Sequence, residues 1–303
     1  MYIANPIYDT VFKFLLEDNA LAKLLIGAII QEEIITLDFR PQERTGEVDH
    51  RGGPRVLTVY RVDFSARVRN AAGEERLVLI ELQKAKYPTD IMRFRRYLGG
   101  QYRDPDNTCE VDLNAGKTPP RPVRHGLPLL TIYFLGHALE YTEAPVIRVQ
   151  RQCTDLATGE PLAQKEPFIE SLTHDSYIIQ IPQLHGQHRT EVEAMLQLFD
   201  QNRIRGDRHR LVIEEAEIPE RYRPLLRRLQ RAVAEPAIAD AMELEDEVLQ
   251  ELQDMERTIE RERAEKEKER AEKEKERERA DQERAEKERL LALLKQAGID
   301  PGS

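Results

Sequence analysis

The chain has 303 residues, of which 40% are hydrophobic and 34% charged, and its formal net charge at pH 7 is −10. This hydrophobic content is sufficient for a folded core, whereas no apolar run is long enough to span a membrane and no signal peptide is recognisable. The two cysteines, Cys109 and Cys153, are too few for a disulfide framework or a cysteine-based zinc site. We therefore expect a cytoplasmic, reducing compartment.

The negative charge is concentrated near the C-terminus. Residues 243–289 contain 20 acidic and 13 basic residues, which leaves a net charge of −3 for the rest of the chain. The net charge therefore does not exclude a nucleic-acid partner, because a local basic stretch is enough to bind phosphates.

The first predicted element is an amphipathic helix over residues 5–30, in which apolar residues recur at helical spacing. Asp9 and Lys13 are four positions apart in this helix, so we expect them to lie on the same side of it. Both residues are therefore candidates for a polar site next to the helix.

Two β-strands are predicted next, over 56–68 and 77–83, as a hairpin. Successive side chains of a strand point to opposite faces. Asp63 is therefore expected on the face opposite its apolar neighbours, and Glu81 and Gln83 are expected on the face opposite theirs. Two carboxylates that converge on neighbouring strands form a hard-oxygen site suited to Mg²⁺ or Mn²⁺. The alternative interpretation is an ordinary solvent-facing strand surface, on which single acidic residues are common.

The segment after the hairpin is basic and is predicted to form a helix over 90–102. Residues 84–103 contain six Lys or Arg and one acidic residue. Arg93 and Tyr97 share one side of this helix, and together with Arg96, and with Lys13 of the first helix, they are candidates for nucleic-acid binding. In a phosphodiester-cleaving site such cations hold backbone phosphates, while the carboxylates hold the metal that activates water. The alternative is a solvated basic helix face.

The remaining elements complete an α/β pattern. We expect a loop over 104–124, a buried strand over 127–135 and a strand over 146–153 that pairs with it. One more strand is expected over 176–181, and helices are expected over 191–199 and 219–234. This order of elements predicts an α/β sandwich with a mixed sheet.

The C-terminal region is predicted to be one long charged helix. Apolar residues three or four positions apart over 241–259 predict a short coiled-coil seam. The seven-residue unit at 263–269 repeats unchanged at 270–276 without a large apolar residue, which predicts a solvent-exposed charged helix. The leucine-rich end over 290–297 is either a self-association site or the end of the helix. We expect a homodimer that forms through this region.

Asp63, then Glu81-Leu82-Gln83, then the basic helix resemble, in this order, the PD-(D/E)XK nuclease superfamily. Within it, the opening Asn5–Lys13 segment and the leucine-rich end are similar to the recombination-promoting nuclease/putative transposase group. The resemblance implies a restriction-endonuclease-like mixed sheet flanked by helices, followed by a helical region and a long charged C-terminal helix. The corresponding domains are a nuclease core at 1–155, an α/β to helical extension at 156–240 and the C-terminal helix at 241–303.

The resemblance also implies a metal-dependent DNA endonuclease that acts in recombination, mobile elements or defence. Asp63 and Glu81 would then bind Mg²⁺ or Mn²⁺, and Asp9 would complete the acidic pocket. Gln83 stands where the superfamily usually has a lysine that orients the attacking water, and glutamine can hydrogen-bond water but brings no charge. Lys84 is a candidate for the missing cation only if a bulge turns it to the other side of its strand, and Lys13 is a second candidate.

Three classes of function remain open from the sequence. The first is a metal-dependent DNA endonuclease, whose activity is weakened by Gln83. The second is a catalytically silent nucleic-acid-binding or regulatory module with the same fold. The third is an assembly protein whose C-terminal helix is the functional part. We expect the first.

Overall fold

In the computed structural model, the described residues are 1–50, 53–71, 73, 75–85, 91–112, 122–162, 166–186 and 188–248, with isolated helical positions after them. Within these ranges the side chains of 40–63, 81–85, 93, 111 and 112 are outside the description. The chain divides into two units, Met1–Glu245 and Asp246–Ser303.

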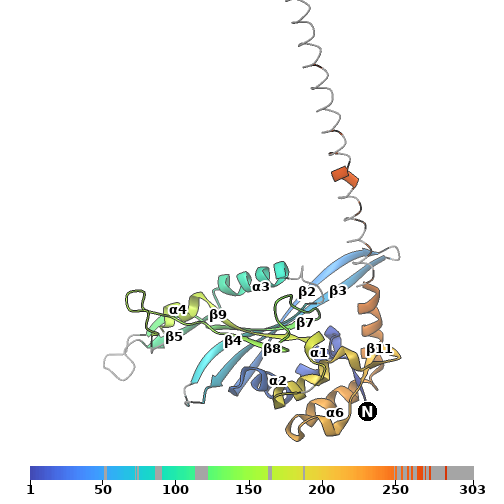
Figure 1. The fold of residues 1–303 in the computed structure, drawn as a ribbon, viewed down its shortest axis with the longest axis horizontal. Helices are drawn as coiled ribbons and strands as arrows, with labels where there is room; N and C mark the ends of the chain where they lie inside the picture. The colour runs from blue at the N-terminus through green and yellow to red at the C-terminus, as the bar shows by residue number, and fades with distance from the viewer. Residues whose placement is uncertain are drawn as a thin grey trace, which may run out of the picture. The chain divides into compact units, whose positions relative to one another are not determined.

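The first unit contains both strands and helices (Figure 1). In chain order these are β1 (Tyr2–Ala4), α1 (Asp9–Leu16), α2 (Asn19–Ile30), β2 (Glu33–His50), β3 (Gly53–Arg69), β4 (Glu75–Ala85), α3 (Ile91–Arg103), β5 (Thr108–Asp112), β6 (Pro122–Gly126), β7 (Leu129–Leu135), β8 (Val146–Val149), α4 (Pro167–Leu172), β9 (His174–Gln180), α5 (Glu191–Leu196), β10 (Ile204–Arg205), β11 (Asp207–Val212) and α6 (Arg223–Ala232).

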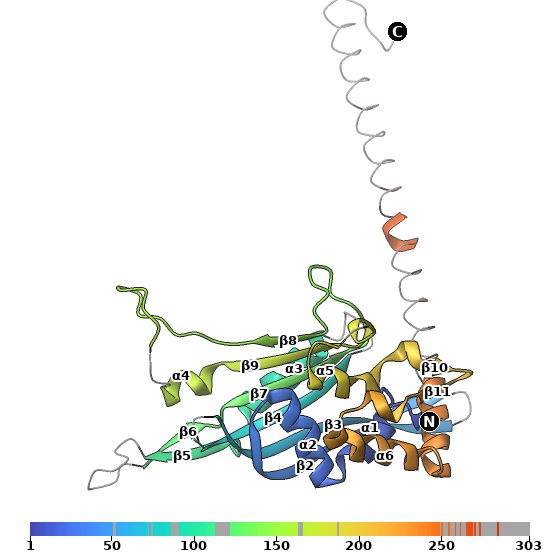
Figure 2. The same cartoon turned by 60° about the horizontal axis from the view of Figure 1, so that its bottom comes forward.

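The central element is a six-stranded mixed sheet with the strand order β2-β3-β4-β7-β9-β8. β4, β7 and β9 are parallel to one another, whereas the β2–β3, β3–β4 and β8–β9 pairs are antiparallel. The predicted α/β class with a mixed sheet is thus confirmed. A small sheet joins β1, β11 and β10, and the β5–β6 hairpin projects from one end of the molecule (Figure 2). The region 156–240 contributes β9 to the main sheet.

One face of the main sheet, which we call the core face, carries the hydrophobic core. Helices α1 and α2 pack on this face, and Figure 1 shows them on the opposite side of the sheet from α3. Phe12 of α1 lies 5.4 Å from the ring of Phe134 on β7, and Phe199 lies 4.9 Å from the same ring. The strand residues of the core face are Phe64, Ala66, Val68, Val78, Ile80, Leu130, Ile132, Phe134, Tyr177 and Ile179.

The predicted single helix over 5–30 is wrong, because the chain forms two helices with a break at Glu17 and Asp18. The Asp18 carboxylate accepts hydrogen bonds from the backbone N–H groups of Ala20 and Leu21 and so caps α2. Aspartate is among the preferred N-cap residues, and this local preference outweighs the continuous apolar periodicity across the break.

Two further expectations need correction. Residues 146–149 pair with β9, not with β7, because β9 lies between them in the sheet. The expected loop over 104–124 contains β5 and β6, which pair with each other. The sequence also did not predict β2. This segment contains many polar residues as well as Pro41 and Gly46, so it lacks the alternation of apolar and polar residues that indicates a strand. Pairing with β3 along its length stabilises this strand instead.

In the second unit, every position that the structure describes is helical. Residues 241–248 of the predicted coiled-coil seam are helical, whereas most of 249–259 and all of the leucine-rich end at 290–297 lie outside the described residues. Over the part of the chain that is described, no helix is both long and apolar enough to cross a membrane.

Candidate metal and nucleic-acid site

The face of the sheet opposite the core face, which we call the α3 face, contains the positions of both predicted metal ligands. Positions 63 and 81 alternate with the buried core-face residues Phe64 and Ile80. They are also direct register partners across the antiparallel β3–β4 pair, so they belong to the same face. Residues opposed in this way have Cβ atoms about 4.5–5.5 Å apart, which is close enough for two carboxylates to share a cation. The side chains of Asp63 and Glu81 themselves lie outside the described residues.

The same row of the α3 face continues across two more strands as a pair of hydroxyl groups. Thr131 on β7 is the register partner of Glu81, and Ser176 on β9 is the partner of Thr131. The Thr131 hydroxyl donates a buried 2.8 Å hydrogen bond to that of Ser176. Sequence reasoning missed this pair, although Thr131 interrupts an otherwise apolar strand. A polar row of four residues therefore crosses the sheet: Asp63, Glu81, Thr131 and Ser176.

Helix α3 is anchored over the next row of this face. Gln83 pairs with Tyr133, and the ring of Phe94 stacks on that of Tyr133 at 5.0 Å with an interplanar angle of 29°. Leu135, Leu139 and Ile178 complete this small apolar cluster. The start of α3 therefore lies against the row that contains Gln83, which is the next row of this face after that of Asp63 and Glu81. Arg93 precedes Phe94, and its side chain lies outside the described residues.

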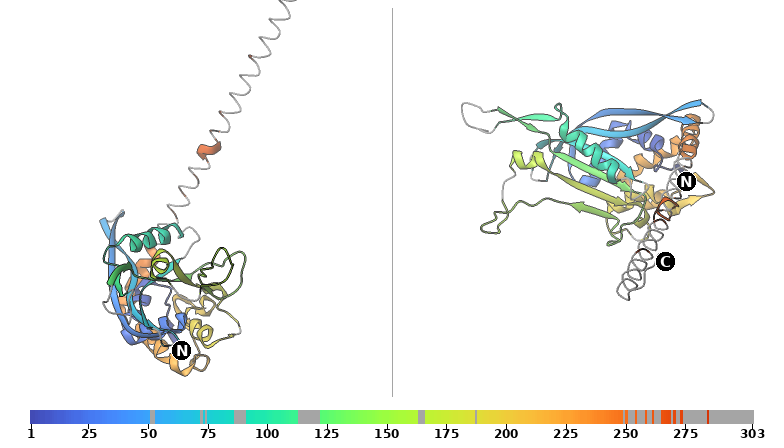
Figure 3. Two further views of the ribbon diagram at one scale, coloured as in Figure 1. Left: turned by 90° about the vertical axis from the view of Figure 1, so that its left-hand side faces the viewer. Right: turned by 90° about the horizontal axis from the view of Figure 1, so that it is seen from above.

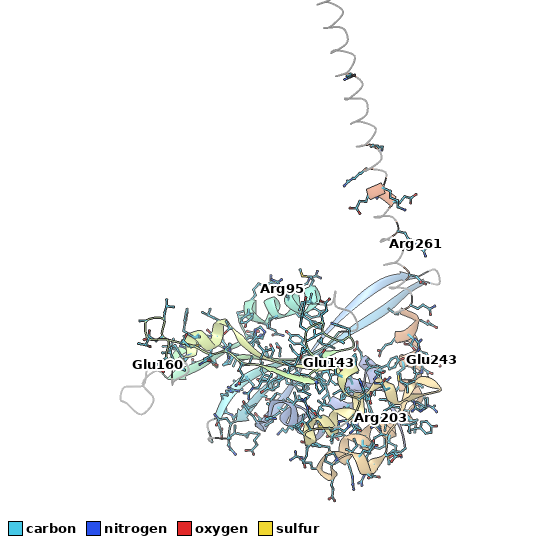
Figure 4. The ribbon with its side chains drawn as sticks, viewed as in Figure 1. Arg95, Glu143, Glu160, Arg203, Glu243 and Arg261 are labelled. Atoms are coloured by element: carbon cyan, nitrogen blue, oxygen red, sulfur yellow. The ribbon has the colours of Figure 1, made fainter. Side chains whose placement is uncertain are left out.

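Helix α3 has one buried side and one exposed side. Gln101 is only 3% exposed, and its side-chain oxygen accepts a 2.6 Å hydrogen bond from Asn107. Tyr97 is half-buried, whereas Arg95 and Arg96 are exposed. Figure 4 shows Arg95 on the side of α3 that is turned away from the sheet. The helix thus presents Arg96 to solvent, with Tyr97 at the margin of the buried side.

At the far end of α3, Tyr102 contacts His174 of β9, with 2.9 Å between the hydroxyl and Nδ1. Burial raises the pKa of Tyr102 above its ordinary value. Burial, followed by the nearby Arg151 guanidinium, lowers the pKa of His174. Arg151 in turn donates hydrogen bonds to Asp175 and Glu170 and so ties β9 to α4. The charge of Arg151 is neutralised by these carboxylates, which makes this group a structural clamp.

Three other predicted residues occupy a core-face position of a strand or lie on a helix that packs on the core face. The β4–β7 register runs from Leu79 to Ala85 without a shift, so no bulge turns Lys84 away from the face of its partner Phe134. Asp9 and Lys13 lie on α1, which packs against the core face. The structure therefore does not bring these three residues to the row of Asp63 and Glu81.

The N-terminal segment that carries part of the family resemblance has a structural use in this fold. The Asn5 amide donates to Gln201 and to the Arg208 carbonyl, both at 2.8 Å, and Gln201 donates back to Asn5. The backbone N–H groups of Asp9 and Thr10 donate to the Glu245 carboxylate, which caps the N-terminus of α1. These contacts fasten the start of the chain to residues 201–245.

Among the side chains that the structure describes, no group of three His, Cys, Asp or Glu is arranged to hold a metal ion, and Asp63 and Glu81 are outside that set. What the backbone provides is two opposed carboxylate-bearing positions beside a helix with exposed arginines. Comparison with known proteins adds nothing to this picture, since no family model, no curated protein and no solved structure matches the chain.

Proposed function

We propose that this protein is a metal-dependent endonuclease that hydrolyses phosphodiester bonds in DNA, built on a restriction-endonuclease-like sheet. The observation that carries the proposal is the register of β3 and β4, in which Asp63 and Glu81 are direct partners. The strand order and the position of α3 beside this pair are consistent with it. The family resemblance of the motif supplies the choice of substrate.

The residues fit a hard divalent cation. Carboxylate oxygens are the ligands that Mg²⁺ and Mn²⁺ prefer, and two of them on rigid neighbouring strands would hold such an ion in place. When bound, the ion would activate a water molecule and offset the negative charge that develops on the phosphate. Gln83 follows two positions after Glu81 on the same face and would orient the water by hydrogen bonding. Arg96 and Tyr97 would hold the substrate strand beside it.

Nicking of supercoiled plasmid by the full-length protein tests the proposal. Cleavage should require Mg²⁺ or Mn²⁺ and stop in EDTA. Asp63→Ala and Glu81→Ala should each remove cleavage while leaving thermal unfolding unchanged, because neither position belongs to the core face. Asp38→Ala is the matched control, since Asp38 is an exposed carboxylate at the neighbouring row, opposite Ser65. If both site variants nick plasmid as the unmodified protein does, the proposal is wrong.

One observation favours a second candidate function, a catalytically silent nucleic-acid-binding or regulatory module. Gln83 brings no charge, Lys84 occupies a core-face position of β4, and Lys13 lies on α1, which packs on the core face. A silent module would bind DNA with the same affinity in EDTA and in Mg²⁺ and would leave plasmid intact in both. The nicking experiment therefore separates the two candidates directly.

We also propose that the protein is a homodimer held by residues 241–303, because a site that nicks one strand cuts both strands when it is paired. Light scattering on the intact protein should give the mass of a dimer. Substituting Leu290, Leu291, Leu293 and Leu294 together by Ser should lower this mass while nicking of one strand persists. An unchanged mass would remove the leucine-rich end from the interface.

A further inference from the structure

The β2–β3 hairpin extends well beyond the rest of the sheet. β4 pairs with β3 only as far as Leu82 with Val62, whereas β2 and β3 remain paired from Gln42 with Arg61 to His50 with Gly53. At about 3.4 Å per residue, this two-stranded portion is about 27 Å long. We call it the arm (residues 42–50 and 53–61). Figures 1 and 3 show it projecting from the end of the sheet opposite the β5–β6 hairpin.

The register of the arm separates its charges by sign. Residues that pair across the arm occupy the same face, and the register has no shift between Thr36 and His50. The arm positions that continue the α3 face include Arg44, Arg55, Arg61 and His50 and no acidic residue. The positions that continue the core face include three acidic residues and no basic one, namely Glu43, Glu47 and Asp49.

This separation is not what solubility alone requires. A solvent-exposed ribbon is kept soluble by charges of both signs interspersed on both of its faces. Here both strands contribute to the basic face, because Arg44 comes from β2 while Arg55 and Arg61 come from β3. The basic face is also continuous with the proposed site, since the pair that precedes the arm is Arg40 with Asp63. The basic face of the arm is therefore about 27 Å long and ends next to the positions of the two carboxylates.

We propose that the arm binds the sugar-phosphate backbone of duplex DNA through its basic face and delivers the duplex to the Asp63–Glu81 positions. A two-stranded β-ribbon is one of the elements that the major groove of B-DNA admits, since the groove is about 12 Å wide. The acidic face then points away from the phosphates, which fixes the side of the arm that meets DNA. This inference rests on the proposed function for its choice of DNA as partner, but binding by the arm does not require cleavage.

The test measures binding of a fluorescently labelled duplex to the full-length protein in EDTA, by anisotropy, over a series of salt concentrations. The variant Arg44→Gln/Arg55→Gln should bind the duplex about tenfold more weakly. The slope of log K plotted against log salt concentration should also be smaller in magnitude, by about 0.9 for each phosphate that the variant no longer neutralises. The matched control Glu43→Gln/Glu47→Gln lies on the same two strands and the opposite face. It should bind as tightly as the unmodified protein or more tightly.

A second variant, Arg44→Lys/Arg55→Lys, separates charge from folding of the hairpin. It keeps both cations and should therefore keep most of the affinity and of the salt slope. Equal affinity and equal slope for the Gln variant and the unmodified protein would overturn the inference. So would a Gln variant that loses affinity for phosphatidylserine vesicles while its affinity for DNA is unchanged, since the arm would then face a membrane.

Failure of the arm and failure of the nuclease proposal give different results. If Asp63→Ala abolishes nicking while the arm variants bind DNA normally, the arm inference falls and the nuclease stands. If Asp63→Ala and Glu81→Ala both nick normally while Arg44→Gln/Arg55→Gln loses DNA binding, the nuclease site is wrong and the arm stands.

Discussion

Strand β7 turns Leu130, Ile132 and Phe134 toward the core face, and Thr131 and Tyr133 toward the α3 face. The first three residues are at most 3% exposed and belong to the continuous core that α1, α2 and the strands share. Each such side chain contributes about 1.5–3 kcal/mol by burial. On the other face, the Thr131 hydroxyl is bonded to Ser176, and Tyr133 remains partly exposed under α3. Alternate residues of one strand thus serve stability and a polar surface separately.

The helices on the two faces are held in different ways. Helices α1 and α2 contribute Val11, Phe12, Leu25 and Ile26, all nearly inaccessible to solvent, to the large core. Helix α3 contributes a single buried apolar residue, Phe94, to a much smaller cluster. Because the core face supplies most of the apolar burial, the α3 face is free to carry carboxylates and cations that would be costly in a core. A division of this kind permits surface chemistry to change without loss of the fold.

The largest expected effect on stability comes from substitutions at two neighbouring positions of β7, one on each face of the sheet. Phe134→Ala removes a buried ring that contacts Phe12 and Phe199, so it should lower the free energy of unfolding by about 3–5 kcal/mol. Tyr133→Ala removes a partly exposed ring stacked on Phe94 and should cost only about 1–2 kcal/mol. Urea unfolding of both variants measures the difference. Equal costs would mean that the α3 face is as much a core as the other face.

The next expected effect is on the plasmid nicking rate and comes from substitutions at two neighbouring positions of β4. Gln83→Lys places a cation two positions after Glu81 on the α3 face, so the plasmid nicking rate should be preserved or rise by up to about tenfold. Lys84→Ala changes a position on the core face and should alter the rate by less than about twofold, because the β4–β7 register has no shift near it. Initial nicking rates under saturating Mg²⁺ decide this. A Lys84→Ala protein as inactive as Glu81→Ala would make Lys84 the catalytic lysine.

The sequence predicted the parts of the fold that have a strong local signal. Strict alternation around Phe64 and the apolar run of residues 77–80 located β3 and β4, and the run over 127–135 located β7. β2 was missed because its residues have no such pattern and it is stabilised by partners distant in sequence. The break between α1 and α2 was missed because it depends on one capping aspartate within a continuous apolar periodicity.

For the candidate site, the alternation of side chains along the two strands was informative. Asp63, Glu81 and Gln83 were assigned to one face from the period of a strand, and the register places these positions on one face. The sequence did not show which side of α3 is buried, and the structure buries Phe94 against Tyr133 and Gln101 against Asn107. Thr131 and Ser176 are 45 residues apart, so their contact depends on strand order, which a single sequence does not reveal.

A smaller effect on stability is expected at Thr131 on the α3 face and at its neighbour Ile132 on the core face. Thr131→Val keeps the shape of the side chain but leaves the buried Ser176 hydroxyl without its donor, so it should cost about 1–2 kcal/mol. Adding Ser176→Ala should recover part of this loss, because both polar groups are then absent. Ile132→Val is the control on the core face and should cost about 0.5–1.5 kcal/mol that Ser176→Ala does not recover. Thermal unfolding of the three single variants and of the two double variants that contain Ser176→Ala tests this, and additive costs at 131 and 176 would contradict it.

The smallest expected effect lies at the end of the α3 face, where Tyr102 meets His174. Tyr102→Phe removes one partly exposed hydrogen bond and should lower the free energy of unfolding by about 0.5 kcal/mol at pH 7.5.

The pKa of His174 is depressed below 6.5 in the folded protein by burial and then by Arg151, so the unfolded chain binds the proton more readily. The stability associated with neutral His174 is therefore present above about pH 6.5 and is lost as the pH falls through the lower folded-state pKa. Replacing His174 by Gln removes this titration, so the gap in unfolding free energy between the unmodified protein and His174→Gln should narrow as the pH falls from 7.5 to 5. His185→Gln is the control, since the His185 ring is exposed and its Nδ1 lies 2.6 Å from the Pro182 carbonyl oxygen. A gap that stays constant over this range would show that His174 titrates alike in the folded and unfolded chain, and that the far end of α3 is as open to water as the exposed side of the helix.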